Sequence, residues 1–128
     1  LNGARQLWKR DVYSKVCTPV IHQGRIYWAW RDVYCLDWKT GETVWKGPSG
    51  LGDPGSCLVT GDDRLIVWAD EGTLLLMETA ERSPQQPKVL SKKDRIFRRD
   101  AWPHVVLSDG RLFCKDRDGN LKCLAISN

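Results

Sequence analysis

The sequence predicts an all-β fold made of repeated antiparallel units, and three observations support this fold class. No window of about a dozen residues shows an apolar stripe of helical spacing that Gly or Pro does not interrupt. Short apolar runs alternate with turn-forming Gly, Asp and Pro, and seven tryptophans are spread along the chain, as is typical of strands. These runs also recur at a regular distance. With 128 residues, the chain is long enough for one modest domain with a core.

We predict twelve short strands from the apolar runs and their flanking turns. They are expected near residues 6–10, 18–22, 25–30, 33–37, 43–46, 56–60, 64–68, 73–77, 88–90, 104–108, 111–115 and 121–125.

The repeat is anchored by three similar tripeptides that begin at Arg25, Arg64 and Arg111. Each follows an apolar strand and a polar turn, and each leads through a second turn into another strand. The anchors are 39 and then 47 residues apart, and a period near 40 made of four short antiparallel strands marks a β-propeller blade. The sequence therefore predicts a propeller segment of about three blades.

We predict that residues 1–128 form one segment, with blades near residues 16–47, 54–91 and 101–126. The third repeat supplies only three strands. Its outer strand is expected at the other end of the chain, because "QLWKR" at 6–10 is similar to "TVWKG" at 43–47. This displaced strand would complete the last blade, from the same chain or from another copy.

The stretch "LDWKTGETVW" places Asp37, Thr40, Gly41 and Trp45 in the pattern Asp-x-x-Thr-Gly-x-x-x-Trp. This pattern resembles the tryptophan docking motif of the pyrroloquinoline-quinone-like (PQQ-like) propeller repeats. That family includes quinoprotein alcohol dehydrogenases and the non-enzymatic propeller lipoprotein of the outer-membrane assembly machine. The resemblance implies that Asp37 binds the turn N–H groups, that Gly41 takes a positive φ and that Trp45 packs between blades. Trp8 is expected to be the counterpart of Trp45.

Catalysis in quinoprotein dehydrogenases, as the resemblance implies, requires an adjacent cysteine pair, calcium held by Glu and Asn, and a basic Asp. This chain has five cysteines, none adjacent in sequence, and no matching Glu–Asn–Asp set. We therefore expect no catalytic, cofactor or metal residues in this chain; PQQ and calcium would lie in a longer parent. The cysteines are expected to be mostly buried hydrophobes, with one disulfide left open.

Other features receive structural interpretations. His22 and His104 are expected to be ordinary strand residues. Residues 116–120, "DRDGN", begin like a calcium loop but lack a Glu at the twelfth position, so a hairpin turn is expected. A basic run is interpreted as a solvated loop between blades, with a polyanion-binding patch as the alternative. Its members are Lys92, Lys93, Arg95, Arg98 and Arg99.

Three blades cannot close a ring, since propellers have about four to eight. We therefore predict a scaffold or interaction module whose partners are further blades of a longer chain or a second copy, giving a six-bladed homodimer. The alternatives are a fragment of a PQQ-dependent alcohol dehydrogenase, which is an oxidoreductase, and a basic polyanion-binding module. The net charge of +4 does not argue for nucleic acid, and no apolar run is long enough to span a bilayer. The family resemblance suggests a periplasmic or extracellular location.

Overall fold

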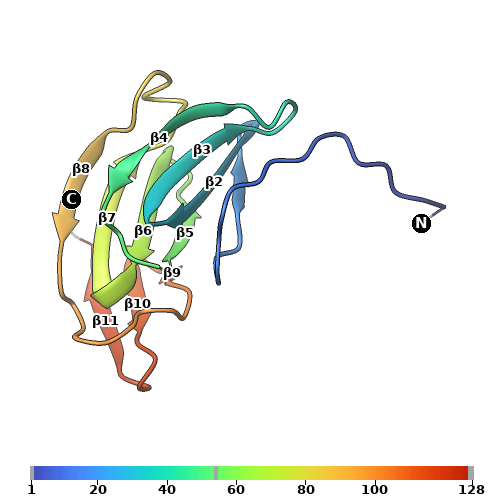
Figure 1. Cartoon of the computed structure of the whole chain (residues 1–128). Helices are drawn as coiled ribbons and strands as arrows, with labels where there is room; N and C mark the ends of the chain where they lie inside the picture. The colour runs from blue at the N-terminus through green and yellow to red at the C-terminus, as the bar shows by residue number, and fades with distance from the viewer. Residues whose placement is uncertain (1, 54, 127–128) are drawn as a thin grey trace.

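The computed structural model describes residues 2–53 and 55–126, and it contains three antiparallel sheets (Figure 1). The first sheet contains β1 (Val20–His22), β2 (Arg25–Trp30), β3 (Asp32–Asp37) and β4 (Thr43–Ser49). The second contains β5 (Gly55–Val59), β6 (Arg64–Ala69), β7 (Thr73–Glu78) and β8 (Val89–Lys93), with a 3-10 turn at Asp70–Gly72. The third contains β9 (Val106–Ser108), β10 (Arg111–Lys115) and β11 (Leu121–Ala125).

The all-β prediction is confirmed, because eleven of the expected strands form and each pairs with its neighbour in sequence. Strand ends differ from the predicted ones by a few residues. The largest differences are at β4, which continues to Ser49 where an end near residue 46 was predicted, and at β8, which continues to Lys93 where the sequence indicated an end near residue 90. The register of β8 explains the difference there, since Lys92 and Lys93 pair with β7 although their side chains are exposed.

The predicted strand at 6–10 does not form within a single chain. Residues 2–19 adopt no assigned strand, because no strand lies beside them to accept their hydrogen bonds. Figure 1 shows this segment running first away from the sheets and then beside the first sheet before β1. Side chains hold the segment instead. The indole N–H of Trp8 donates to the carbonyl oxygen of Trp38 at 2.9 Å, and Arg10 donates to the hydroxyl of Thr43 at 3.4 Å.

Apolar clusters between the sheets form the core. Tyr27, Cys35 and Trp45 of the first sheet face Val67 and Leu75 of the second in one cluster. The opposite face of the second sheet packs against the third through another cluster. Members of that cluster include Ile66, Trp68, Phe97, Leu112 and Cys114. The second sheet is therefore covered on both sides, which explains why β6 is a continuous apolar run instead of an alternating one.

The three sheets share one register, which makes their positions comparable. Arg25, Arg64 and Arg111 lie opposite Asp37, Glu78 and Ala125 respectively. The irregularity between β3 and β4 follows the Cys35–Trp45 pair. The irregularity between β7 and β8 follows the Leu76–Ser91 pair, at the corresponding point. Ser91 of the second sheet therefore occupies the position that Trp45 occupies in the first.

The five cysteines are free, and three of them, Cys35, Cys57 and Cys114, are buried. Burial raises the pKa of the Cys35 thiol to about 12, so this side chain stays protonated as a small hydrophobe. In the part of the chain that the structure describes, no helix has the length and apolar character needed to cross a membrane.

Candidate functional site

Asp37 organises the turn between β3 and β4. Its Oδ1 accepts hydrogen bonds from the backbone N–H groups of Lys39 (2.9 Å) and Thr40 (3.0 Å), and its Oδ2 lies 2.7 Å from Nη1 of Arg25. The N–H of Thr40 above all, then that of Lys39 and the charge of Arg25, hold the pKa of Asp37 below its ordinary value. Gly41 closes the turn with φ of +71° and donates its N–H to the carbonyl oxygen of Asp37 at 2.8 Å.

Trp8 lies flat against this turn. A Cβ added to Gly41 would come within 2.6 Å of the Trp8 ring, so only glycine lets the indole approach this closely. The sequence of the N-terminal segment is thus explained by a contact with the first sheet of its own chain. Trp8 belongs to the segment before β1, and it covers the turn that precedes β4.

Trp45 is buried between the first and second sheets, with only 4% of its surface exposed. Its ring centroid lies 5.9 Å from that of Tyr27, whose hydroxyl accepts a hydrogen bond from the backbone N–H of Ala80 at 3.0 Å. Ala80 belongs to the same apolar cluster and follows β7, at the end of the second sheet that corresponds to Gly41 in the first. Trp8 therefore lies against a small residue after the third strand of the first sheet, and Trp45 shares an apolar cluster with a small residue after the third strand of the second.

Trp45 fills the space between the first and second sheets, whereas the smaller Ser91 leaves a groove at the corresponding position between the second and third sheets. The groove has a volume of about 500 Å³ and lies between the second and third sheets. Leu74 and Leu76 line it from β7, and Leu112 and Leu124 line it from the third sheet. The outer part of this second interface is therefore open to solvent.

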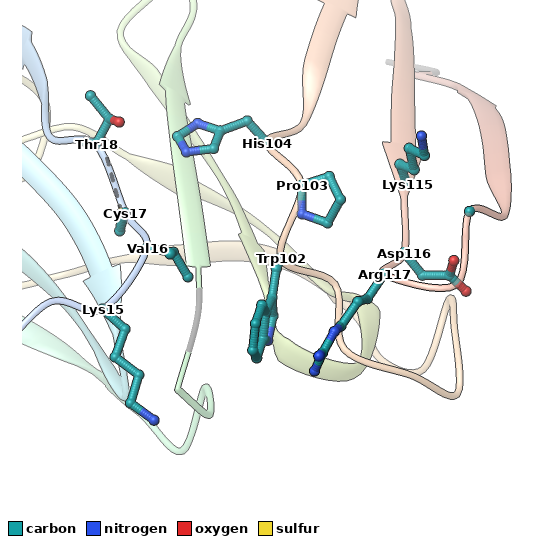
Figure 2. Close-up of a pocket in the computed structure, with 11 residues that line it drawn as sticks. Lys15, Val16, Cys17, Thr18, Trp102, Pro103, His104, Lys115, Asp116 and Arg117 are labelled. Carbon is teal, nitrogen blue, oxygen red and sulfur yellow. Dashed lines mark hydrogen bonds between the residues drawn. The ribbon is translucent and has the colours of Figure 1, made fainter.

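A larger cleft of about 710 Å³ lies between the segment before β1 and the loops of the third sheet (Figure 2). Lys15, Val16, Cys17 and Thr18 form one wall. The other wall comes from the segment before β9 and from the β10–β11 turn, and it contains Trp102, Pro103, His104, Lys115, Asp116, Arg117 and Gly119. Residues that are nearly a hundred positions apart thus face one hollow, as Figure 2 shows.

Arg117 and Trp102 contact each other in this cleft. The guanidinium carbon of Arg117 lies 4.4 Å from the ring centroid of Trp102, and its Nη1 lies 3.3 Å from Oδ2 of Asp100. The backbone N–H of Arg117 also donates to the carbonyl oxygen of Asp100 at 2.8 Å. This arrangement fixes one aromatic and one cationic side chain at the mouth of the cleft.

Asp116 is a buried residue in the wall of the cleft. Burial opposes its ionisation, but hydrogen bonds from the backbone N–H and the side-chain amide of Asn120, both 2.7 Å, outweigh burial and lower the pKa of Asp116. The predicted hairpin turn at 116–120 is present between β10 and β11. The Asp116 carboxylate therefore stabilises this turn. On the other wall of the cleft, Lys15 forms an ion pair with Asp53.

The predicted basic run is divided by the fold. Lys92 and Lys93 belong to β8, and Lys92 lies 3.1 Å from Asp94. The three arginines of the run, Arg95, Arg98 and Arg99, line a hollow of about 510 Å³ beside the β10–β11 turn. Two apolar residues between them, Ile96 and Phe97, are buried against the second sheet. The run is therefore a connector anchored by its apolar residues, with arginines exposed on it.

The predicted histidines lie apart from each other. His22 ends β1, and its Nε2 lies 2.7 Å from Oδ1 of Asp63 in the β5–β6 turn, which links the first two sheets. His104 precedes β9 and belongs to the cleft wall. Within residues 2–53 and 55–126, no three His, Cys, Asp or Glu side chains gather closely enough to hold a metal ion.

Sequence reasoning did not find the cleft. Its walls come from three separate segments whose meeting depends on how the first and third sheets pack on the second. The one signal available in advance was the position of Trp102, an aromatic residue directly before a predicted strand, next to Pro103.

Three face-to-face antiparallel sheets of three or four strands define this chain as a segment of a β-propeller. Among solved structures, the chain is similar to BamB from Moraxella catarrhalis, with a TM-score of 0.71 at 16% sequence identity. The alignment covers 92% of this chain and 36% of the BamB chain, so the chain spans about a third of that protein. At this identity the likeness shows the fold alone.

Two computationally designed proteins align less closely. Ika4 gives a TM-score of 0.48 at 10% identity, with 97% of this chain and 99% of Ika4 covered. Ika8 gives a TM-score of 0.41 at 11% identity, with 87% and 45% covered. No family model matches the sequence, and neither does any curated protein.

Proposed function

We propose that this chain is a PQQ-like propeller segment that acts as a scaffold for protein–protein interaction and has no catalytic centre of its own. The cleft beside Trp102 is the observation that carries the proposal. Its carboxylates are engaged within the third-sheet wall, since Asp116 binds Asn120 and Asp100 binds Arg117. The side chains directed to the hollow are recognition groups.

The chemistry of the cleft favours a protein segment as its ligand. Trp and Arg are the residues that most often dominate binding energy in protein interfaces. Trp102 and Arg117 are both exposed and are already fixed against each other, so little side-chain freedom is lost on binding. Lys15, Lys115 and Arg117 make the rim cationic. A peptide segment with an apolar side chain for Trp102 and carboxylates for the rim would fit.

The turn geometry supports the PQQ-like assignment within this proposal. Asp37 accepts the N–H groups of its turn, and Gly41 has a positive φ. Trp8 lies against Gly41, and Trp45 is buried between sheets. If the chain is such a repeat segment, a periplasmic or cell-surface location follows from the same proposal.

Two other functions remain as rival proposals. A longer parent would be a quinoprotein alcohol dehydrogenase if further blades carry PQQ and calcium. The hollow lined by Arg95, Arg98 and Arg99 favours a polyanion as the second candidate ligand. A polyanion would release counterions on binding, so its affinity would fall steeply with salt.

Site-specific photocrosslinking tests the scaffold function. A photoreactive residue at position 104 lies in the cleft, and the same residue at Lys39 lies in the β3–β4 turn, at the opposite end of the strands. In cells of the source organism, we expect a defined protein adduct from position 104 that is lost when Trp102→Ala is added, and no such adduct from position 39. Equal labelling from both positions, or none from 104, would refute the proposal.

The rivals are tested in parallel. Alcohol-dependent dye reduction by the parent protein with added PQQ and calcium would establish the dehydrogenase. Heparin affinity that falls with salt, and that is lost in Arg95→Gln, Arg98→Gln, Arg99→Gln, would establish the polyanion module. The scaffold function predicts neither result.

A further inference from the structure

The outer edge of β11 is open among the residues that the structure describes. The third sheet has three strands, whereas each of the other two has four. All but one residue of β11 are exposed, and Leu121 is 64% exposed. A free strand edge with apolar side chains is a template for pairing with another chain.

The shared register defines what a fourth strand here would look like. Ala125 pairs with Arg111 as Asp37 pairs with Arg25, so Cys123 of β11 corresponds to Cys35 of β3. Cys35 lies directly opposite Trp45. A fourth strand in the third sheet would therefore place its own Trp45 equivalent opposite Cys123.

Residues 6–10 have the matching sequence, and their backbone is available. Trp8 corresponds to Trp45 in "QLWKR" and "TVWKG". Its indole already lies against Gly41, a small residue after the third strand of its own first sheet, and Trp45 shares an apolar cluster with Ala80, a small residue after the third strand of the second. The segment has no strand neighbour, and Leu7 is 74% exposed. Figure 1 shows the chain before Trp8 continuing away from the three sheets.

We infer that β11 of one copy takes residues 6–10 of a second copy as the fourth strand of its third sheet, with Trp8 opposite Cys123. Trp8 would keep its place on Gly41 of its own chain, so the exchange joins the third sheet of one copy to the first sheet of the other. The exchange is reciprocal, and the two copies bring six sheets, a number that closes a propeller ring. This inference rests on the propeller scaffold proposed above and names its partner as a second copy of this chain.

The side chains beside Trp8 fit the same arrangement. Neighbouring residues of a strand point to opposite faces, so Leu7 would face the second sheet when Trp8 faces away from it. On that side lies the apolar groove lined by Leu76, Leu124 and Ile126. Lys9 would come opposite Lys122 at the exposed edge, where water and salt screen the repulsion between them.

Sedimentation equilibrium over a range of concentrations tests the inference. With rising concentration, we expect the measured mass to approach twice the chain mass of 14.6 kDa. Alkylation of Cys123 should become slower as the fraction of dimer increases. Leu7→Lys should raise the dimer dissociation constant at least tenfold and leave the circular dichroism of the dilute chain unchanged, because Leu7 is exposed in one copy. Val89→Lys is the control, since Val89 is 40% exposed on β8 of the second sheet, does not line the groove and should leave the constant unchanged.

Disulfide trapping tests the register. Trp8→Cys should form an inter-chain disulfide with Cys123 on oxidation, whereas Arg10→Cys should not. Three results would each overturn the inference. The folded chain could stay at the mass of a monomer, it could grow into open oligomers, or it could form a dimer that Leu7→Lys does not weaken and that Trp8→Cys does not trap as a disulfide. Photocrosslinking at position 104 does not depend on the dimer, so loss of one proposal is distinguishable from loss of the other.

Discussion

Replacing Ser91 with Trp should stabilise the chain. Ser91 occupies the position of Trp45 in the shared register, and it lines the groove of about 500 Å³ between the second and third sheets. The new indole would meet Leu74, Leu76 and Leu124 in this groove. The substitution would therefore repeat, between the second and third sheets, the packing that exists between the first and second.

The expected gain follows from the area that the indole would bury. A Trp buries about 150–250 Å² when it is enclosed. The groove is open on its outer side, so about half of that area, roughly 100 Å², would leave water, which contributes about 2.5 kcal/mol at 25 cal/mol per Å². Ordering the side chain costs about 0.5–1 kcal/mol. The free energy of unfolding should therefore rise by about 1.5–2 kcal/mol.

Urea unfolding followed by circular dichroism measures this change. With a slope of about 2 kcal/mol/M, the midpoint should move up by roughly 0.8–1 M with the slope unchanged. Lys92→Trp is the matched control, because its side chain points to the other face of the sheet and no gain is expected there. A Ser91→Trp midpoint at or below that of the wild type, or equal to that of Lys92→Trp, would refute the assigned register.

Three further predictions concern the turn and the thiols. Gly41→Ala and Gly50→Ala introduce similar backbone strain, since φ is +71° and +82°, but only Gly41→Ala also displaces an indole. In urea unfolding, Gly41→Ala should therefore be about 1 kcal/mol less stable than Gly50→Ala. Equal urea midpoints for the two variants would contradict the contact between Trp8 and Gly41. The turn N–H groups lower the pKa of Asp37, so its ionised form stabilises the fold above about pH 4, and this contribution is lost as the pH falls through the lowered pKa. The stability difference between the wild type and Asp37→Asn should therefore shrink below about pH 4, and a constant difference would argue against the lowered pKa. In a dilute sample at about pH 8, iodoacetamide should alkylate exposed Cys123 and leave Cys35 unmodified, because burial raises the pKa of Cys35 to about 12. Mass spectrometry of the peptides measures both sites, and alkylation of Cys35 ahead of Cys123 would contradict the prediction.

The sequence predicted the strands well because most of them belong to hairpins. Each assigned strand pairs with its neighbour in the chain, so local alternation and turn residues are sufficient to indicate it. The segment 6–10 has the same local pattern but forms no strand within a single chain, because a strand also requires a neighbour. The similarity between Trp8 and Trp45 nevertheless reflects packing, since the Trp8 indole lies against Gly41 and Trp45 is packed in one apolar cluster with Ala80.

The candidate site was less predictable than the fold. The stacking of Arg117 on Trp102 and the position of Lys15 across the cleft depend on how three segments meet in space. No periodicity within one segment encodes such a meeting. The groove beside Ser91 was also invisible in advance, because it required the register of β8, whose residues are all exposed and carry no apolar alternation.

The burial of the second sheet on both faces has a consequence for how the chain folds. The sheets contact one another in series, so the stability of each depends on its own hairpins and on its neighbours, as in a linear array. Because the middle sheet has a neighbour on both sides, its amides should exchange with solvent only when the whole array opens. The third sheet, which has one neighbour and an open edge, should open first. Folding is then expected to begin with the hairpin of β6 and β7 and to proceed outward in both directions.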